Sequence, residues 1–187
     1  MPIPTFLARL SKINLSVLIF LSSIVVTAQL APLSPKATVS VLTCATGNES
    51  YSLFGHTAVR IADPEQFLDI VYNYGAFDFS TPNFVAKFAK GDLQYFVVAD
   101  SFSEFIGRYQ YEGRSVYEQK LRLSLPLKQQ LFDQLNKTLQ SEERFYTYKF
   151  IDRNCTTMVV DLLNQTIGTK AITKKDATKK TYREVLF

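Results

Sequence analysis

The chain has 187 residues, 47% of them hydrophobic, which is enough to build one domain around a substantial core. Lysine and arginine exceed aspartate and glutamate by 21 to 17. The excess falls to two once Arg9 and Lys12 of the N-terminal segment are removed, which argues against nucleic-acid binding. One histidine and two cysteines are too few for a zinc centre, and no phosphate or dinucleotide motif is present, so we expect no metal and no cofactor.

The first 28 residues have the layout of a secretory signal peptide. Arg9 and Lys12 give a basic start, residues 13–26 are mostly apolar, and Ala28 is a small residue at the expected cleavage position. The alternative is a retained membrane anchor, but the apolar run is shorter than the roughly 20 residues that span a bilayer. We therefore expect cleavage after Ala28 and a periplasmic or secreted protein.

The remaining chain alternates between predicted strands and helices. Two prolines and a lack of periodicity in residues 29–37 indicate a linker. Alternating residues bounded by turn-forming sequence predict strands at 38–44, 56–61, 69–74, 93–99 and 116–124. Helical spacing predicts helices at 82–89, 102–109, 126–139 and 155–167. The mixture indicates an α+β domain, residues 38–168, built on an antiparallel sheet and followed by a basic tail, residues 169–187.

The last predicted helix begins at a cysteine. Asp152 and Asn154 are good N-cap residues, and Gly168 stands where a C-terminal cap belongs. Cys155 therefore lies in the first helical turn. Unpaired backbone N–H groups and the positive end of the helix dipole favour a thiolate over a thiol there. This position suits a nucleophile.

Composition leaves other interpretations of the cysteines open. Two cysteines in an exported chain often pair, and a Cys44–Cys155 disulfide would close a long loop, so composition slightly favours the bridge. Cys44 alone is typical of a core residue near the end of a strand. His56, the single histidine, stands at the start of a predicted strand, and a lone histidine is more often structural or exposed than catalytic.

Five segments together resemble one known family: TGNESYSLFGHTAVRI, VYNYGAFDF, KGDLQYFV, GRSVYEQKLRLS and YTYKFIDRNCTTMVVDLL. They resemble the N-terminal periplasmic domain of Lnb, the bacterial lipoprotein N-acylation protein. The resemblance runs from about residue 39 to about residue 168, and FGHTAVRI and DRNCTT are its specific elements.

The resemblance implies a circularly permuted papain-like (NlpC-type) fold, in the manner of lecithin–retinol acyltransferase, with the histidine strand before the cysteine helix. It implies Cys155 as the nucleophile and His56 as the general base. A third, polar residue usually orients the imidazole in papain-like sites. We assign Asn73 to this role, because a neutral amide orients histidine without changing its charge, and Asp69 on the same strand face is the second choice. A turn role for Asn73 ahead of Gly75 is an equally good interpretation.

The resemblance also implies a lipoprotein or lipid acyl substrate, with Tyr72, Tyr74, Tyr148 and Asn154 as expected substrate-binding residues. The basic tail either contacts anionic lipid headgroups or is simply solvated. Lnb proteins, by this resemblance, continue into a membrane-embedded region that has no counterpart in these 187 residues. A stand-alone relative, a short paralogue and a truncated chain are the open interpretations, and a separate membrane partner is one expectation among them.

Three functions compete at this point. The first is an Lnb-type thiol acyltransferase or lipid-acyl hydrolase, which an apolar channel beside Cys155 would favour. The second is an NlpC-type cysteine peptidase or amidase on peptidoglycan peptides, which a polar cleft would favour. The third is a non-catalytic envelope module, which requires a Cys44–Cys155 disulfide remote from His56.

Overall fold

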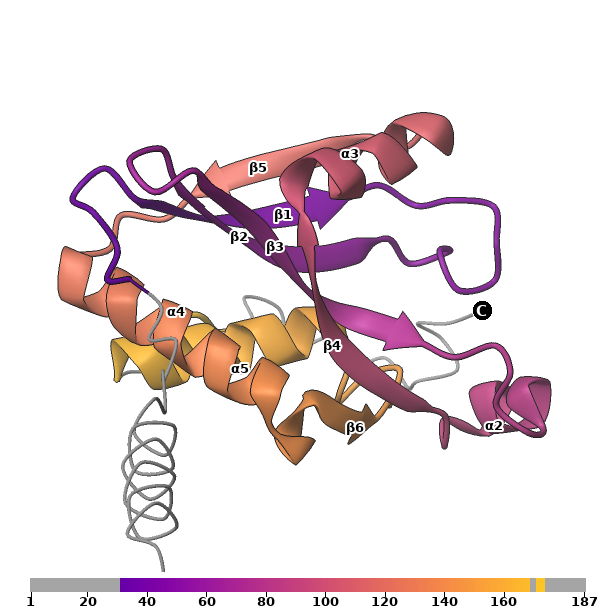
Figure 1. Ribbon diagram of the computed structural model, residues 1–187. Coiled ribbons are helices and arrows are strands. Elements are labelled where there is room, and N and C mark those ends of the chain that lie inside the picture. The colour runs from indigo at the N-terminus through magenta and orange to yellow at the C-terminus, as the bar shows by residue number, and fades with distance from the viewer. Residues whose placement is uncertain (1–30, 169–170, 174–187) are drawn as a thin grey trace, which may run out of the picture. The chain divides into compact units, whose positions relative to one another are not determined.

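The computed structural model describes residues 31–168 and 171–173, which form one antiparallel sheet flanked by helices (Figure 1). The compact unit that contains the sheet begins at Leu33. The expected signal peptide, residues 1–28, and most of the predicted basic tail lie outside the described residues.

Six strands form the sheet of the described residues, and every neighbouring pair is antiparallel. The order across the sheet is β5-β1-β2-β3-β4-β6. The strands are β1 Thr38–Cys44, β2 His56–Asp63, β3 Leu68–Phe77, β4 Gln94–Ser101, β5 Val116–Lys120 and β6 Phe145–Thr147. The register places Cys44 opposite His56 and Ala58 opposite Asn73, so His56 opens an interior strand at one end of the sheet.

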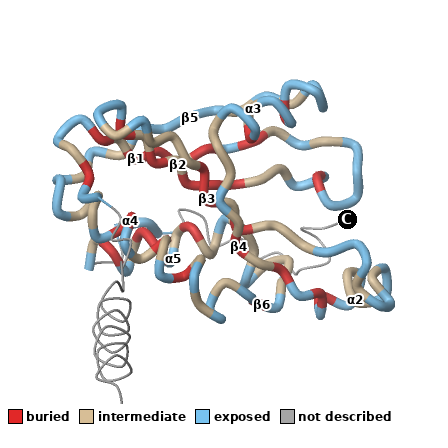
Figure 2. Tube along the Cα trace, in the orientation of Figure 1, coloured by how far each residue is buried: buried red, intermediate tan, exposed pale blue. Residues whose placement is uncertain are grey.

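Four α-helices accompany this sheet within the described residues: α2 Phe84–Lys90, α3 Phe102–Tyr111, α4 Leu125–Gln140 and α5 Cys155–Ile167. Helices α4 and α5 lie together below the sheet in Figure 1, whereas α3 lies above it and contacts β3 and β4. Leucines of α4 and α5, such as Leu135 and Leu163, pack with Val59 and Tyr72 in the larger core, and Figure 2 shows this buried interior. A smaller core joins Phe105 of α3 to the sheet.

Most predicted elements are confirmed, with differences at their ends. The bounds of β1 and α5 agree with the prediction, but β5 ends at Lys120 rather than residue 124. Beyond Lys120 the chain leaves the sheet, and Leu121 and Leu123 pack against the larger core. The three-residue strand β6 was not predicted, because it is too short to show periodicity and depends on pairing with the edge of β4.

The predicted linker, residues 29–37, is wrong at its C-terminal end. Leu33 is buried in the larger core, and its N–H donates to Oε1 of Gln129 at 2.7 Å. Ser34 donates through its N–H and its hydroxyl to the carboxylate of Asp63, both at 2.6 Å. These contacts attach the segment to α4 and to the end of β2, so the fold starts before β1.

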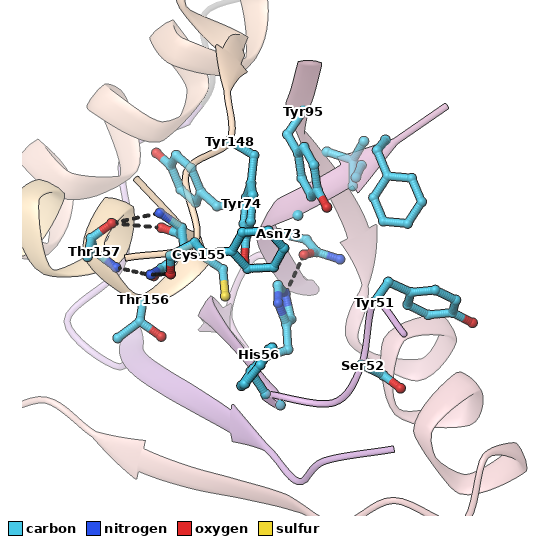
Figure 3. Close-up of a pocket in the computed structure, with 18 of the residues that line it drawn as sticks. Tyr51, Ser52, His56, Asn73, Tyr74, Tyr95, Tyr148, Cys155, Thr156 and Thr157 are labelled. Carbon is cyan, nitrogen blue, oxygen red and sulfur yellow. Dashed lines mark hydrogen bonds between the residues drawn. The ribbon is translucent and has the colours of Figure 1, made fainter. Parts of the chain in front are cut away.

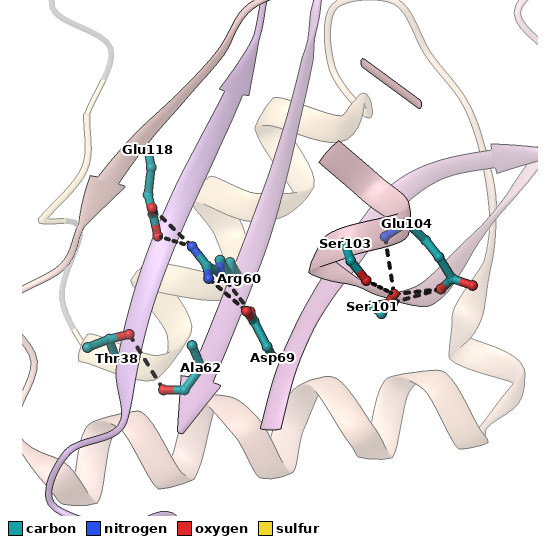
Figure 4. Close-up of polar contacts among 8 residues, drawn as sticks. All are labelled: Thr38, Arg60, Ala62, Asp69, Ser101, Ser103, Glu104 and Glu118. Carbon is teal, nitrogen blue, oxygen red and sulfur yellow. Dashed lines mark hydrogen bonds and ion pairs between the residues drawn. The ribbon is translucent and has the colours of Figure 1, made fainter. Parts of the chain in front are cut away.

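Asp69, the second choice for the orienting residue, has a structural partner instead. The guanidinium of Arg60 on β2 donates to both carboxylate oxygens of Asp69 at 2.8 Å (Figure 4). The same guanidinium pairs with Glu118 on β5 and stacks over the ring of Phe102, 3.5 Å from its centroid. Asp69 therefore belongs to an ion-pair group that ties β2, β3 and β5 together.

Candidate active site

Helix α5 begins at Cys155 because the preceding residue caps it. The Asn154 side chain accepts the Thr157 N–H at 3.0 Å, and the Thr157 hydroxyl accepts the Asn154 N–H at 2.9 Å. This reciprocal pair is a capping box. The remaining N–H groups of the first turn, that of Cys155 among them, have no partner within the helix, so they leave a positive partial charge at the start of α5.

His56 and Asn73 meet across neighbouring strands. The distance between Nε2 of His56 and Oδ1 of Asn73 is 2.6 Å. An amide oxygen can only accept, so Nε2 donates its proton, which leaves Nδ1 as the ring nitrogen that can receive a proton. Asn73 thus fixes both the orientation and the tautomer of the imidazole.

Gly75 provides the surface on which the imidazole rests. A Cβ atom at this position would lie 2.7 Å from Cε1 and 3.3 Å from Nδ1 of His56. The site therefore requires a residue without a side chain here, and sequence analysis treated Gly75 only as the end of a strand. A register shift between Tyr74 and Ala76 marks the same point of β3.

The thiol of Cys155 points toward His56 (Figure 3). Burial raises the pKa of this thiol, but the hydrogen bond and the charge of His56, the Thr57 N–H and the Thr156 hydroxyl together lower it below its ordinary value. The donors around the sulfur outweigh its burial, so the thiolate forms more readily than in an ordinary cysteine.

A pair of threonines joins the histidine strand to the cysteine helix. Thr57 follows His56, Thr156 follows Cys155, and their hydroxyl oxygens lie 2.8 Å apart. This contact spans 99 residues of sequence and holds β2 against the start of α5. Sequence analysis did not identify either threonine, although each is the immediate neighbour of a predicted site residue.

Cys155, His56 and Asn73 open into a cavity of about 880 Å³. Aromatic rings line much of it, and two of them, Tyr95 and Tyr148, are stacked with centroids 4.4 Å apart. Elsewhere its wall carries charged side chains, including Arg108 and Arg114. Arg114 donates to the Ala45 carbonyl oxygen at 2.8 and 2.9 Å and pairs with Glu112. The volume is of the size that holds a small-molecule ligand.

The family model described as the Lnb N-terminal periplasmic domain matches residues 27–186. The chain belongs to this family. Comparison with curated proteins and with solved structures finds no significant match. The description of the Lnb family indicates a periplasmic location, in line with the expected export. In the part of the chain that the structure describes, no helix is long and apolar enough to cross a bilayer, and no group of three or more potential metal ligands is found.

The four predicted substrate-binding residues of this Lnb-family domain have different surroundings. Tyr74 and Tyr148 line the cavity, and burial raises the pKa of each phenol to about 12, so both remain neutral hydrogen-bond donors. Asn154 also lines it, but its amide is engaged by the capping box and by the Phe150 carbonyl at 2.8 Å. Tyr72 does not line the cavity; it is buried in the larger core, and its hydroxyl donates to Asn136 at 3.0 Å.

Cys44 and Cys155 are both free thiols. Cys44 is only 2% exposed and packs in the smaller core, as expected for a residue near the end of a strand. Burial raises the pKa of the Cys44 thiol, although a hydrogen bond with Tyr109 and the charge of Arg114 oppose this. Its position opposite His56 therefore does not make it a second nucleophile.

Proposed function

We propose that this Lnb-family domain is a cysteine-nucleophile acyltransferase or hydrolase of lipid acyl groups, with a circularly permuted papain-like (NlpC-type) arrangement. The observation that carries the proposal is the group Cys155, His56 and Asn73: a thiol of lowered pKa at a helix start, beside an imidazole held by an amide. The histidine strand also precedes the cysteine helix in the chain, as the permuted order requires.

Acylation would begin with attack by the Cys155 sulfur on an ester or amide carbonyl carbon. Nδ1 of His56 takes the thiol proton, and the sulfur lone pair forms the S–C bond. The carbonyl π electrons move to oxygen to give a tetrahedral oxyanion. The N–H of Cys155 at the start of α5 is the natural donor to this oxyanion. When the intermediate collapses, the leaving oxygen or nitrogen takes the proton from His56, and a thioester remains.

Transfer of the acyl group would reverse these roles. An amine or a water molecule attacks the thioester carbonyl, His56 takes its proton, and the Cys155 thiolate leaves. An amine acceptor gives an N-acylated product and water gives a free fatty acid. The hydrogen bond from Nε2 to Asn73 keeps the ring in the same orientation through both steps.

The lining of the cavity supports a lipid acyl substrate. The stacked rings of Tyr95 and Tyr148 adjoin Phe150, whose ring centroid lies 5.3 Å from that of Tyr148. Such surfaces bury methylene groups, each contributing about 0.8 kcal/mol. Envelope lipoproteins or lipids are therefore the proposed substrates, and a separate membrane partner and contact of the basic tail with the membrane surface are part of the same proposal.

The test is formation of an acyl adduct on the purified protein. Incubation with an activated fatty-acid ester at neutral pH, followed by an acid quench and intact mass measurement, is expected to show one acyl group per chain, on Cys155. Cys155→Ala is expected to carry none. Cys44→Ala is the matched control and is expected to acylate like the unchanged protein, because Cys44 is buried away from the cavity lining.

Two results would overturn the assignment. Acylation of Cys155→Ala at the original rate would show that another group is the nucleophile. Loss of acylation in Cys44→Ala, with Cys155 intact and the protein folded, would show that the second thiol has a chemical role.

A further inference from the structure

Six aromatic side chains beside the cavity form a connected series, which we call the aromatic collar: Tyr51, Phe54, Phe79, Phe84, Phe88 and Phe150. They come from three separate segments: the loop between β1 and β2, the segment from the end of β3 through α2, and the loop before α5. Centroids of successive rings lie 5.0–6.4 Å apart in the order Tyr51–Phe79–Phe84–Phe88–Phe150–Phe54. Tyr51 and Phe54 belong to one loop, so the series returns to its starting segment.

The collar joins the cavity wall to the protein surface. All its rings except Phe84 line the cavity. Phe54 and Phe79 are nevertheless 62% and 63% exposed. Leu53 and Val85, on two of the same segments, are also largely exposed. Exposed apolar side chains gathered on connected segments mark a surface that contacts a ligand, a protein or a membrane.

We infer that the exposed rings of the collar insert into the surface of a lipid bilayer, so that an acyl chain passes from the membrane into the cavity without crossing water. The inference rests on the proposed function for the identity of the chain that enters. A protein seated on the collar would cover the exposed rings but would supply no acyl chain to the cavity that they line. A bilayer covers the same rings and also supplies a substrate for Cys155. Aromatic rings are favoured at the boundary between lipid headgroups and acyl chains.

The sequence offers a direct way to test this contact, because it contains no tryptophan. A single Phe54→Trp or Phe79→Trp substitution places one fluorophore on the collar. Phe67→Trp is the matched control: Phe67 is 97% exposed, and it lies in the turn after β2, at the opposite end of that strand from His56. All three reporters are made in a Cys155→Ser background, so that binding is measured without chemistry.

The protein for this test is residues 29–187. Both cores lie between Leu33 and Leu163, so this chain holds the complete described fold and lacks the apolar N-terminal segment. Phosphatidylcholine vesicles at physiological salt remove electrostatic attraction to the basic tail. Emission of the Phe54→Trp and Phe79→Trp proteins is expected to shift to shorter wavelength and to be quenched by brominated acyl chains. Emission of Phe67→Trp is expected to stay unchanged.

Affinity variants give a second measurement. Phe54→Ser and Phe79→Ser are each expected to weaken sedimentation with these vesicles by about tenfold, because each removes a ring that would be buried in lipid. Tyr117→Ser, which removes a 66% exposed ring on β5, is expected to bind like the parent protein.

The outcomes separate this inference from the proposed function. Vesicle binding by the collar without acylation of Cys155 would support membrane docking by the collar and contradict the proposed enzymatic function. Acylation of Cys155 by a soluble ester, with no change in collar fluorescence at saturating lipid, would reject the docking surface alone. Binding only to anionic vesicles, abolished by salt and insensitive to Phe54→Ser, would assign membrane contact to the basic tail and overturn the inference. Emission of the Phe54→Trp and Phe79→Trp proteins that shifts only when another protein is added would also overturn the inference.

Discussion

The two cysteines adjoin the same histidine, yet the fold gives their thiols opposite properties. Cys44 lies opposite His56 on the neighbouring strand, inside the smaller core, where burial raises its pKa. Cys155 lies at the start of α5, where donors from β2 and from its own helix overcome burial and lower its pKa. Proximity to His56 in the sheet is therefore not sufficient to lower the pKa of a cysteine thiol. We expect a reactive thiol where a helix start, an imidazole and a cavity coincide.

The largest expected difference between the two thiols is in alkylation of the native protein. With iodoacetamide at pH 7, Cys155 is expected to react about a hundredfold faster than Cys44, because Cys44 reacts only after local opening of the core. Peptide mass mapping over a time course measures both rates. Comparable alkylation rates of Cys155 and Cys44 in the folded protein would show that the two thiols do not differ in reactivity.

His56→Ala is expected to raise the pKa of the Cys155 thiol and so to make this thiol less reactive, as Cys44 is expected to be. The folded pKa of Cys155 lies below 9.0 because His56 contributes most of the lowering, whereas burial, which raises the pKa, persists in the variant. The thiolate fraction at neutral pH therefore falls, and alkylation at pH 7 is expected to slow by about tenfold for each unit of pKa change. The rate measured against pH gives the midpoint, and an unchanged midpoint would contradict the role of His56.

A smaller effect is expected when His56 is displaced rather than removed. Gly75→Ala adds a Cβ 2.7 Å from Cε1 of His56, which must move the ring relative to Cys155. We expect alkylation of Cys155 at pH 7 to slow by about threefold, since a small shift weakens a hydrogen bond without abolishing it.

Gly107→Ala is the matched control for this change. Its Cβ meets no atom within 4 Å, and the residue lies within helix α3, where alanine is favoured over glycine by about 1 kcal/mol. Gly107→Ala is therefore expected to alkylate normally and to unfold at a slightly higher temperature. Equal alkylation rates for the two variants would show that Gly75 does not position the imidazole.

The smallest expected effect concerns Cys44 as a core residue. Cys44→Ala removes a sulfur atom from the smaller core and is expected to lower the free energy of unfolding by about 1 kcal/mol. Urea denaturation measures this change, and the alkylation midpoint of Cys155 is expected to remain where it was. A shifted midpoint would show that the two thiols are electrostatically coupled strongly enough to act as one site.

The start of α5 could be predicted from the sequence because the signals there are local. The cap at Asn154, the apolar stripe and Gly168 are all read within about fifteen residues, and the helix has the predicted bounds. The family resemblance called for a polar residue on the strand after His56, and strand alternation placed both Asn73 and Asp69 on the same face. Asn73 was chosen for its neutral amide, and the structure places the amide oxygen 2.6 Å from the imidazole. Strand alternation did not separate Tyr72 from Tyr74, since both face the larger core and only Tyr74, next to the register shift of β3, reaches the cavity.

The sequence by itself determined the elements of this protein: periodicities of two and of about 3.6 residues, caps and turn residues act over one or two turns of chain. The family resemblance anticipated that Cys155, His56 and Asn73 share a site, but only the tertiary structure decided which other side chains join them. The Thr57–Thr156 contact and the meeting of His56 with Cys155 join segments 99 residues apart, and the aromatic collar joins three separate segments. Such meetings depend on how the faces of β2, β3 and α5 pack, and local patterns carry no information about partners so distant in the chain.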